Sequence, residues 1–324
     1  MQRFRNILCV VEPGESSRYA LERAVSLAEN NQAALHVIDV IPHIIAGIGM
    51  PDGGPISRDL QDTLAGERLQ RLEAQVDPYR KRVDLQLGVL QGTPFLEIIR
   101  EVLRNGHDLV IKHPEDVDWL DRLFSSDDMH LLRKCPCPVW LIKPSATHPY
   151  RQILAAVDVD DAYPAEELQT RQALNRQVLE MAVSLALSEF AALHIVHAWE
   201  AVGEDSMRSA FLHAGEDRIG AYVELVRRHH EASLDALLRE VTAALSNDAM
   251  NYLEPQSHLV KGAARREIPA LARRIDADLV VMGTVARTGV PGLIMGNTAE
   301  TILGQLDCSV LAVKPPGFRT PVSL

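Results

Sequence analysis

The feature that most constrains this chain is an internal repeat of short apolar segments. Four segments of the first half recur in the same order in the second half, where 7–12 matches 153–158, 34–37 matches 192–195, 108–111 matches 278–281, and 139–144 matches 310–315. The separation between matching segments only increases along the chain, which is what a duplicated unit with insertions in its second copy would produce. The segments are rich in Val, Ile and Leu on both faces, which is typical of strands buried in a parallel sheet.

Helical patterns separate these strands in both halves. We predict helices at 16–31, 58–81 and 97–104 in the first half, with Ser16 as an N-cap, and at 166–187, 205–246 and 266–274 in the second. Alternating strands and helices with right-handed crossovers predict an α/β chain of two tandem doubly wound domains, each a five-stranded parallel sheet with helices on both faces. We expect two separate sheets about an approximate two-fold axis, and one continuous sheet would contradict this.

The length of the chain supports two domains, because 324 residues are many for a single core. We place the domains at 1–144 and 151–316, joined by a linker rich in Pro, Ser and Thr. Two further stretches, 46–55 and 201–215, are expected to be mobile excursions.

Composition excludes several classes of function. The chain has 33 Lys and Arg against 44 Asp and Glu, so its net charge of -11 argues against nucleic acid as a partner. The first apolar run is too short for a signal peptide and no stretch is long enough for a membrane span, so we expect a cytoplasmic protein. Cys135 and Cys137 form a lone C-x-C, which favours packing over zinc binding because a second cysteine pair is missing.

The second half carries a glycine-bearing loop after its fourth strand. Gly283 ends that strand, and Gly296 opens the next helix with Asn297 or Thr298 as the expected cap. The free N–H groups at a helix start attract anions, and Arg287 on the loop would add positive charge. Asp158, at the end of the first strand of this half, could accept a hydrogen bond from a base or ribose, since ligands of such sheets bind at the carboxyl ends of the strands.

The first half lacks this loop. No glycine follows its fourth strand, Pro114 removes an N–H group, and Glu12 and its proline neighbour replace the aspartate at the end of its first strand. The carboxylates that follow would repel phosphate; they are Glu115, Asp116, Asp118 and Asp121. We therefore expect a nucleotide only in the second half, with the first half acting as scaffold or holding an uncharged or apolar ligand.

At this point a resemblance becomes specific. Gly283, Ala286, Gly296 and Asn297-Thr298 resemble the G-x2-G-x9-G-[S/T] loop of ATP-binding universal stress proteins, and the whole chain resembles the tandem-domain members of that family. The segments 131–136, 283–289 and 296–300 are similar to its E subgroup. The resemblance implies an adenine nucleotide alpha hydrolase-like fold and a non-enzymatic role in stress survival, including resistance to DNA damage. It also implies ATP or another adenine nucleotide as ligand, with Mg²⁺ as a candidate companion.

Carried over residue by residue, the resemblance marks a nucleotide-binding set. With two further loop residues, Thr284 and Arg287, the set is Val157, Asp158, Ile195, Met282, Gly283, Thr284, Arg287, Gly296, Asn297 and Thr298. Two positions depart from the family pattern. Ala286 stands where a second glycine is usual, so its β-carbon would crowd a phosphate, and Asn297 stands where Ser or Thr is usual. The alternative is a tight turn that binds nothing.

Other functions stay open on the sequence. The apolar loop 290–295 would suit a lipid-binding or protein-interaction module without nucleotide, and slow ATP hydrolysis is a third option. His36 and His194 are expected in the core, whereas His229 and His230 are expected on a solvated helix face. Glu300 is expected to stabilise a helix dipole. Family members pair through their last strands, so the tandem domains can pair within one chain, with a homodimer as the alternative.

Overall fold

The computed structural model describes residues 4–12, 17–44, 55–114, 126–143, 149–210, 215–284 and 295–324. The elements of domain 1 are β1 (Asn6–Val10), α1 (Ser17–Asn31), β2 (Ala34–Ile41), α2 (Pro55–Val76), the 3-10 helix η1 (Asp77–Tyr79), β3 (Leu85–Gln91), α3 (Pro94–Asn105), β4 (Leu109–Lys112), α4 (Ser126–Lys134) and β5 (Val139–Leu141). Those of domain 2 are β6 (Gln152–Ala156), α5 (Ala165–Glu189), β7 (Ala192–Trp199), α6 (Glu204–Ala210), α7 (Glu216–Thr242), α8 (Asn247–Leu253), β8 (Gln256–Lys261), α9 (Ala264–Arg274), β9 (Leu279–Gly283), α10 (Asn297–Leu303) and β10 (Ser309–Val313).

Both domains have the doubly wound strand order. The order is β3-β2-β1-β4-β5 in domain 1 and β8-β7-β6-β9-β10 in domain 2, and every pair inside a domain is parallel. The predicted fold class is therefore confirmed. The central strands are buried along their length, whereas the outer strands β3 and β8 are half-exposed, as expected where an edge strand meets solvent.

The expectation of two separate sheets is wrong. β5 pairs antiparallel with β10, with Trp140 opposite Leu311, so the two five-stranded sheets continue as one ten-stranded sheet. The physical reason is that β5 and β10 are each the last strand of a domain and would otherwise leave a row of unpaired backbone groups. A two-fold relation between like edges makes this pairing antiparallel, and it joins the last strands within a single chain.

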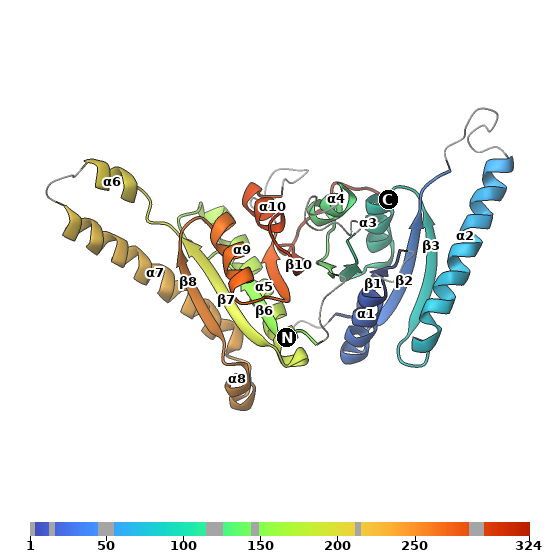
Figure 1. Cartoon of the computed structure of the whole chain (residues 1–324), viewed down its shortest axis with the longest axis horizontal. Helices are drawn as coiled ribbons and strands as arrows, with labels where there is room; N and C mark the ends of the chain where they lie inside the picture. The colour runs from blue at the N-terminus through green and yellow to red at the C-terminus, as the bar shows by residue number, and fades with distance from the viewer. Residues whose placement is uncertain are drawn as a thin grey trace.

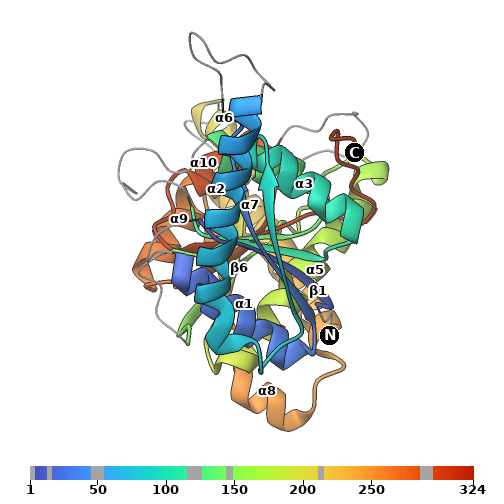
Figure 2. The same ribbon diagram turned by 90° about the vertical axis from the view of Figure 1, so that its right-hand side faces the viewer.

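Helices cover both faces of the sheet (Figure 1). On one face α1, α2, α5 and α7 contribute to one apolar core, and on the other α3, α4, α9 and α10 contribute to a second. Figure 2 turns domain 1 toward the viewer, with α2 in front. In Figure 1, α2 and α7 lie toward the two ends of the molecule and α4 and α10 toward its middle.

A buried cation also joins the domains. Arg23 on α1 is 3% exposed, and its Nη1 lies 2.5 Å from Glu189 Oε1 on α5. Its guanidinium carbon lies 3.7 Å from the centre of the Tyr150 ring. The ion pair and the cation–π contact together keep this charge compensated where the two halves meet.

Three predicted segments differ in detail. The helix expected over 58–81 ends at Val76, because Pro78 cannot continue it, and a short 3-10 turn follows. The helix expected over 205–246 is interrupted, and Ser246 starts α8 by accepting a hydrogen bond from the Ala249 N–H at 3.2 Å. The excursion predicted at 201–215 overlaps the start of that predicted helix and contains α6, and its mobility stays a prediction.

Some sequence predictions lie outside the described residues: the excursion at 46–54, most of the linker at 144–148, and the Ser16 cap. No helix in the described ranges combines the length and the apolarity that crossing a membrane requires.

Candidate functional site

Domain 2 contains a cavity of about 600 Å³ at the carboxyl ends of β6 and β9, beside the start of α10. This volume lies in the range of small-molecule sites. Eight of the ten residues in the predicted set line it; they are Val157, Asp158, Met282, Gly283, Thr284, Gly296, Asn297 and Thr298. The topology thus brings together segments that lie more than a hundred residues apart in the chain.

One predicted residue, Ile195, lies away from the cavity, and another, Arg287, is not described. Ile195 is fully buried in the core of the sheet and does not line the cavity, so a direct ligand contact does not fit its position. Arg287 and Ala286 lie outside the described residues. Thr284 is also fully buried, and its Oγ1 accepts a hydrogen bond from Lys314 Nζ at 2.5 Å. The Thr284 hydroxyl is therefore hydrogen-bonded within the protein, to a residue that does not line the cavity.

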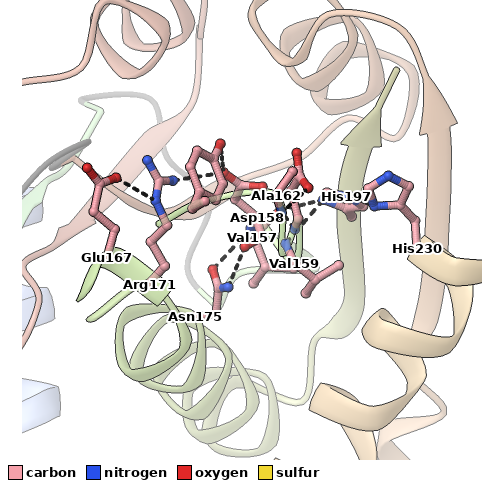
Figure 3. Close-up of polar contacts among 11 residues, drawn as sticks. Val157, Asp158, Val159, Ala162, Glu167, Arg171, Asn175, His197 and His230 are labelled. Carbon is pink, nitrogen blue, oxygen red and sulfur yellow. Dashed lines mark hydrogen bonds and ion pairs between the residues drawn. The ribbon is translucent and has the colours of Figure 1, made fainter. Parts of the chain in front are cut away.

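Asp158 stands at the centre of a polar network on the wall of the cavity (Figure 3). Its Oδ2 accepts hydrogen bonds from Tyr163 Oη at 2.9 Å and from Arg171 Nη1 at 3.0 Å. Asn175 accepts from the Asp158 N–H at 3.0 Å and donates to its carbonyl at 2.6 Å. The Asp158 side chain remains 44% exposed, so it is held in place and can still accept from a ligand.

The sequence analysis missed the partners of Asp158. Arg171 and Asn175 lie four residues apart on α5 and therefore project from one face of that helix, which is the signal that could have marked them. The Arg171 guanidinium carbon lies 3.5 Å from the centre of the Tyr163 ring, so the tyrosine stabilises the cation by a cation–π contact. Burial, and then the charge of Asp158, raise the pKa of Tyr163 to about 12, so the phenol stays a donor.

Two histidines form a second polar pair on the cavity wall. His197 on β7 places its Nε2 3.0 Å from Nδ1 of His230 on α7, and both side chains are buried (Figure 3). The prediction of a solvated position is therefore wrong for His230, whose side chain is buried. It is right for His229, which is exposed and whose Nε2 contacts Asp161 Oδ2 at 2.9 Å. Burial lowers the pKa of His197, so a neutral imidazole is favoured there.

The start of α10 differs from the expected cap. Gly296 itself is the N-cap, with φ −61° and ψ 136°, and no side chain makes a capping hydrogen bond. Asn297 and Thr298 follow as the first helical residues and are exposed toward the cavity. Glu300 forms an ion pair with Arg133 of α4 in domain 1, so it links the domains in addition to its place in the first turn.

Gly283 lines the cavity, and its lack of a side chain also matters for packing. A β-carbon at this position would lie 2.6 Å from Leu174 Cδ2 and 3.0 Å from Leu174 Cγ on α5. A side chain at this position would therefore meet Leu174 in the adjacent helix. The glycine therefore allows β9 and α5 to approach closely.

We expect Gly283→Val to lower the free energy of unfolding by about 1–3 kcal/mol, because it overpacks the β9–α5 contact. Urea unfolding of this variant, of Leu174→Ala and of the double variant measures the coupling between the two positions. The double variant should lose less stability than the two single losses combined, because the smaller residue vacates the space that valine needs. Strictly additive losses would contradict this account of the glycine.

Comparison with known proteins decides the family. The sequence profile described as "Universal stress protein family" matches residues 3–143 and again residues 149–314. The chain belongs to the universal stress protein family. Universal stress protein E of Escherichia coli K12 is 30% identical over 332 residues, covering 100% of this chain and 98% of its relative. The Haemophilus influenzae homologue of that protein is 29% identical over 329 residues, covering 97% of this chain and 98% of its own length.

A solved structure agrees over nearly the whole length. A Pseudomonas aeruginosa PAO1 protein of unknown function is 27% identical with a TM-score of 0.62, and the match covers 96% of this chain and 93% of the other. Both the sequence matches and this structural match extend over two tandem domains.

The two domains of this universal stress protein differ at the position of the cavity. Glu12, Lys112 and Asp128 of domain 1 correspond to Asp158, Met282 and Ala299 of domain 2, all three of which line the cavity. The sheet registers agree, since Val10 pairs with Lys112 as Ala156 pairs with Met282. Lys112 Nζ lies 2.9 Å from Glu12 Oε1 and 3.0 Å from Asp128 Oδ1. An internal ion cluster thus occupies in domain 1 the positions that form the cavity wall in domain 2.

Proposed function

We propose that this universal stress protein binds ATP or another adenine nucleotide in domain 2, at about residues 151–316, and acts in stress survival through binding rather than catalysis. The observation that carries the proposal is that eight residues that the sequence had marked for nucleotide binding line one and the same cavity. Domain 1, at about residues 1–144, is the partner domain without nucleotide.

The chemistry of the cavity wall supports this ligand class. The exposed carboxylate of Asp158 is a hydrogen-bond acceptor for a ribose hydroxyl or a base amine. Arg171 and Arg265 line the same cavity and would face phosphate oxygens with charge-assisted donors. Ala156, Ile268 and Met282 supply apolar surface against which a base could pack. A Mg²⁺ ion would be bound mainly through phosphates and water, as is usual for this ion.

The ion cluster of domain 1 supports the asymmetry. The Lys112 ammonium and the Asp128 carboxylate are both nearly fully buried and paired with each other, so they fill the matching position with protein atoms. A nucleotide there would have to displace this pair and meet the Glu12 carboxylate, which repels phosphate.

We expect Asp158→Ala to weaken ATP binding by about ten- to a hundredfold, or on the order of 1.5–3 kcal/mol, because a charge-assisted hydrogen bond is lost. Isothermal titration of the full chain measures the affinity, and melting temperatures check that the variant is folded. The matched control is Glu12→Ala, at the equivalent position of domain 1, which should leave the affinity unchanged. Unchanged binding by Asp158→Ala, or equal weakening by the control, would refute the assignment.

Mass spectrometry of the natively purified protein identifies the ligand class directly. ATP or AMP would support the proposal, whereas a copurified lipid would favour the apolar-ligand alternative. The cellular part of the proposal is a cytoplasmic role in stress survival that includes resistance to DNA damage. Survival of a deletion strain after irradiation, complemented with the parent or with Asp158→Ala, tests that role and its dependence on the cavity.

A further inference from the structure

Domain 1 contains a cluster of three metal-ligating side chains at the amino ends of its central strands. His36 lies on β2, Glu101 on α3, and His107 just before β4. One ligand atom from each of them lies within 4.8 Å of the other two, and His36 Nδ1 is 3.2 Å from Glu101 Oε1. Glu101 and His107 are each 5% exposed, and His36 is more open. This end of the sheet is opposite to the carboxyl ends that form the cavity in domain 2.

A chain of hydrogen bonds determines the tautomer of His107. The Asn6 side-chain amide donates to the Asn105 carbonyl at 2.8 Å, so Asn6 Oδ1 faces His107 Nδ1, which lies 2.8 Å away. An amide oxygen only accepts, so Nδ1 carries the proton and Nε2 carries a lone pair. That Nε2 is buried and has no hydrogen-bond partner among the described residues. A buried imidazole lone pair without a donor is an unsatisfied acceptor, which a metal ion would satisfy.

The second domain shows that the fold does not require this cluster. Glu101 and His107 correspond to Leu271 and Ala277 at the matching positions of domain 2. His36 corresponds to His194, which has its own partners, Gln152 Oε1 at 2.7 Å and His258 Nε2 at 3.0 Å. In domain 1 the position of His258 is held by Gly88, where a β-carbon would lie only 3.2 Å from His36 Nε2. Domain 1 therefore has two added ligand side chains, and a glycine that leaves room for the His36 ring.

We propose that domain 1 binds a divalent transition-metal ion of the zinc class through His36, Glu101 and His107, with water as a fourth ligand. Two imidazoles and one carboxylate are a ligand set that Zn²⁺ accepts, with bonds of about 2.0–2.2 Å. Neighbouring ligand atoms around a tetrahedral ion of that size lie roughly 3.3 Å apart, close to the separation between His36 Nδ1 and Glu101 Oε1. The ligand atom of His107 lies within 4.8 Å of the other two, so it would move closer to them when the ion binds.

The surroundings fit the role. Asn6 Oδ1 contacts His107 Nδ1 and so orients the ring, and Asn105 Nδ2 donates a hydrogen bond to Glu101 Oε1. Metal ligands are commonly oriented by such hydrogen bonds from neighbouring residues. Arg104 Nη1 is 3.7 Å from the other carboxylate oxygen, Oε2, and its side chain is 46% exposed.

The test measures Zn²⁺ bound by the full chain after dialysis, together with its affinity by competition with a chelator. The variant Glu101→Leu/His107→Ala installs the residues that domain 2 uses at the same positions. We expect the parent to retain one ion more than this variant, and the affinity of the site to fall on the order of a hundredfold or more. Asn6→Ala keeps all three ligands and should weaken binding about 10- to 100-fold. Co²⁺ in place of zinc should give visible absorption bands that the double variant lacks.

The matched control is His258→Ala, which removes a histidine from the domain 2 pair and should leave zinc binding unchanged. Glu101→Gln preserves the shape of the ligand and should also lose the ion, so the proposal stays testable if the double variant fails to fold. A parent protein that retains no zinc, equal retention by parent and Glu101→Gln, or loss only in His258→Ala would each overturn the proposal. Because the readout is metal content, its failure is independent of nucleotide binding in domain 2.

Discussion

Replacing Asp128 by alanine is expected to lower the free energy of unfolding by about 3–5 kcal/mol. Asp128 and Lys112 form a buried ion pair at 3.0 Å, with side chains 0% and 2% exposed. Removing the carboxylate takes away the fully buried partner of this ammonium group, which keeps its contacts with the half-exposed Glu12 carboxylate and the His113 carbonyl. The cost arises from the poorer compensation of a buried charge rather than only from the attraction that is lost.

The control is the pair Asp128→Ala/Lys112→Met, which gives domain 1 the residues that domain 2 has at the same positions. Replacing a whole buried ion pair by apolar residues is often neutral, so the double variant should recover most of the lost stability. Urea unfolding at neutral pH measures all three proteins. A double variant as unstable as Asp128→Ala would show that the cluster contributes through its shape and not through its charge balance. The same double variant also removes the buried ion pair from the position that corresponds to the cavity wall of domain 2.

Lys314 is expected to make the stability of the protein rise steeply with pH above neutrality. It is 4% exposed and donates to the Leu132 carbonyl of domain 1 and to Thr284 Oγ1 of domain 2. Burial lowers its pKa from 10.5 to about 7, and the thiols of Cys135 and Cys137 oppose part of that shift. Between these two pKa values the unfolded chain binds a proton that the folded protein has released, so stability increases with pH.

The comparison with Lys314→Met isolates this contribution. Below about pH 7 both states carry the proton and the folded state bears the full cost of burying the charge. From about pH 7 to about pH 9.5 the parent should gain about 3–4 kcal/mol relative to the variant, since one pKa unit corresponds to about 1.4 kcal/mol. Lys143→Met changes the matching, half-exposed lysine of domain 1, and its stability should change with pH as that of the parent does. Parallel curves for the parent and Lys314→Met would show that Lys314 keeps an ordinary pKa.

The sequence by itself determined the repeat, the parallel α/β class of each half and the second-half position of the residues that line the cavity. Buried parallel strands are runs of Val, Ile and Leu whatever surrounds them, so their pattern is visible without coordinates. The carboxyl ends of parallel strands lie at one edge of a sheet, so Asp158 and Gly283 were expected there together if their strands are neighbours, and the structure pairs these strands as β6 and β9.

Only the tertiary structure decided how side chains from distant segments meet. The continuous sheet depends on β5 and β10 finding each other as unpaired edges, and no local pattern records which edge a strand will contact. The direction of a side chain depends on helix rotation and packing, so Arg171 beside Asp158, His230 against His197 and Gly283 facing Leu174 could not be predicted. The same holds for His36, Glu101 and His107, which lie on three different segments and come together only because the sheet and α3 are packed face to face.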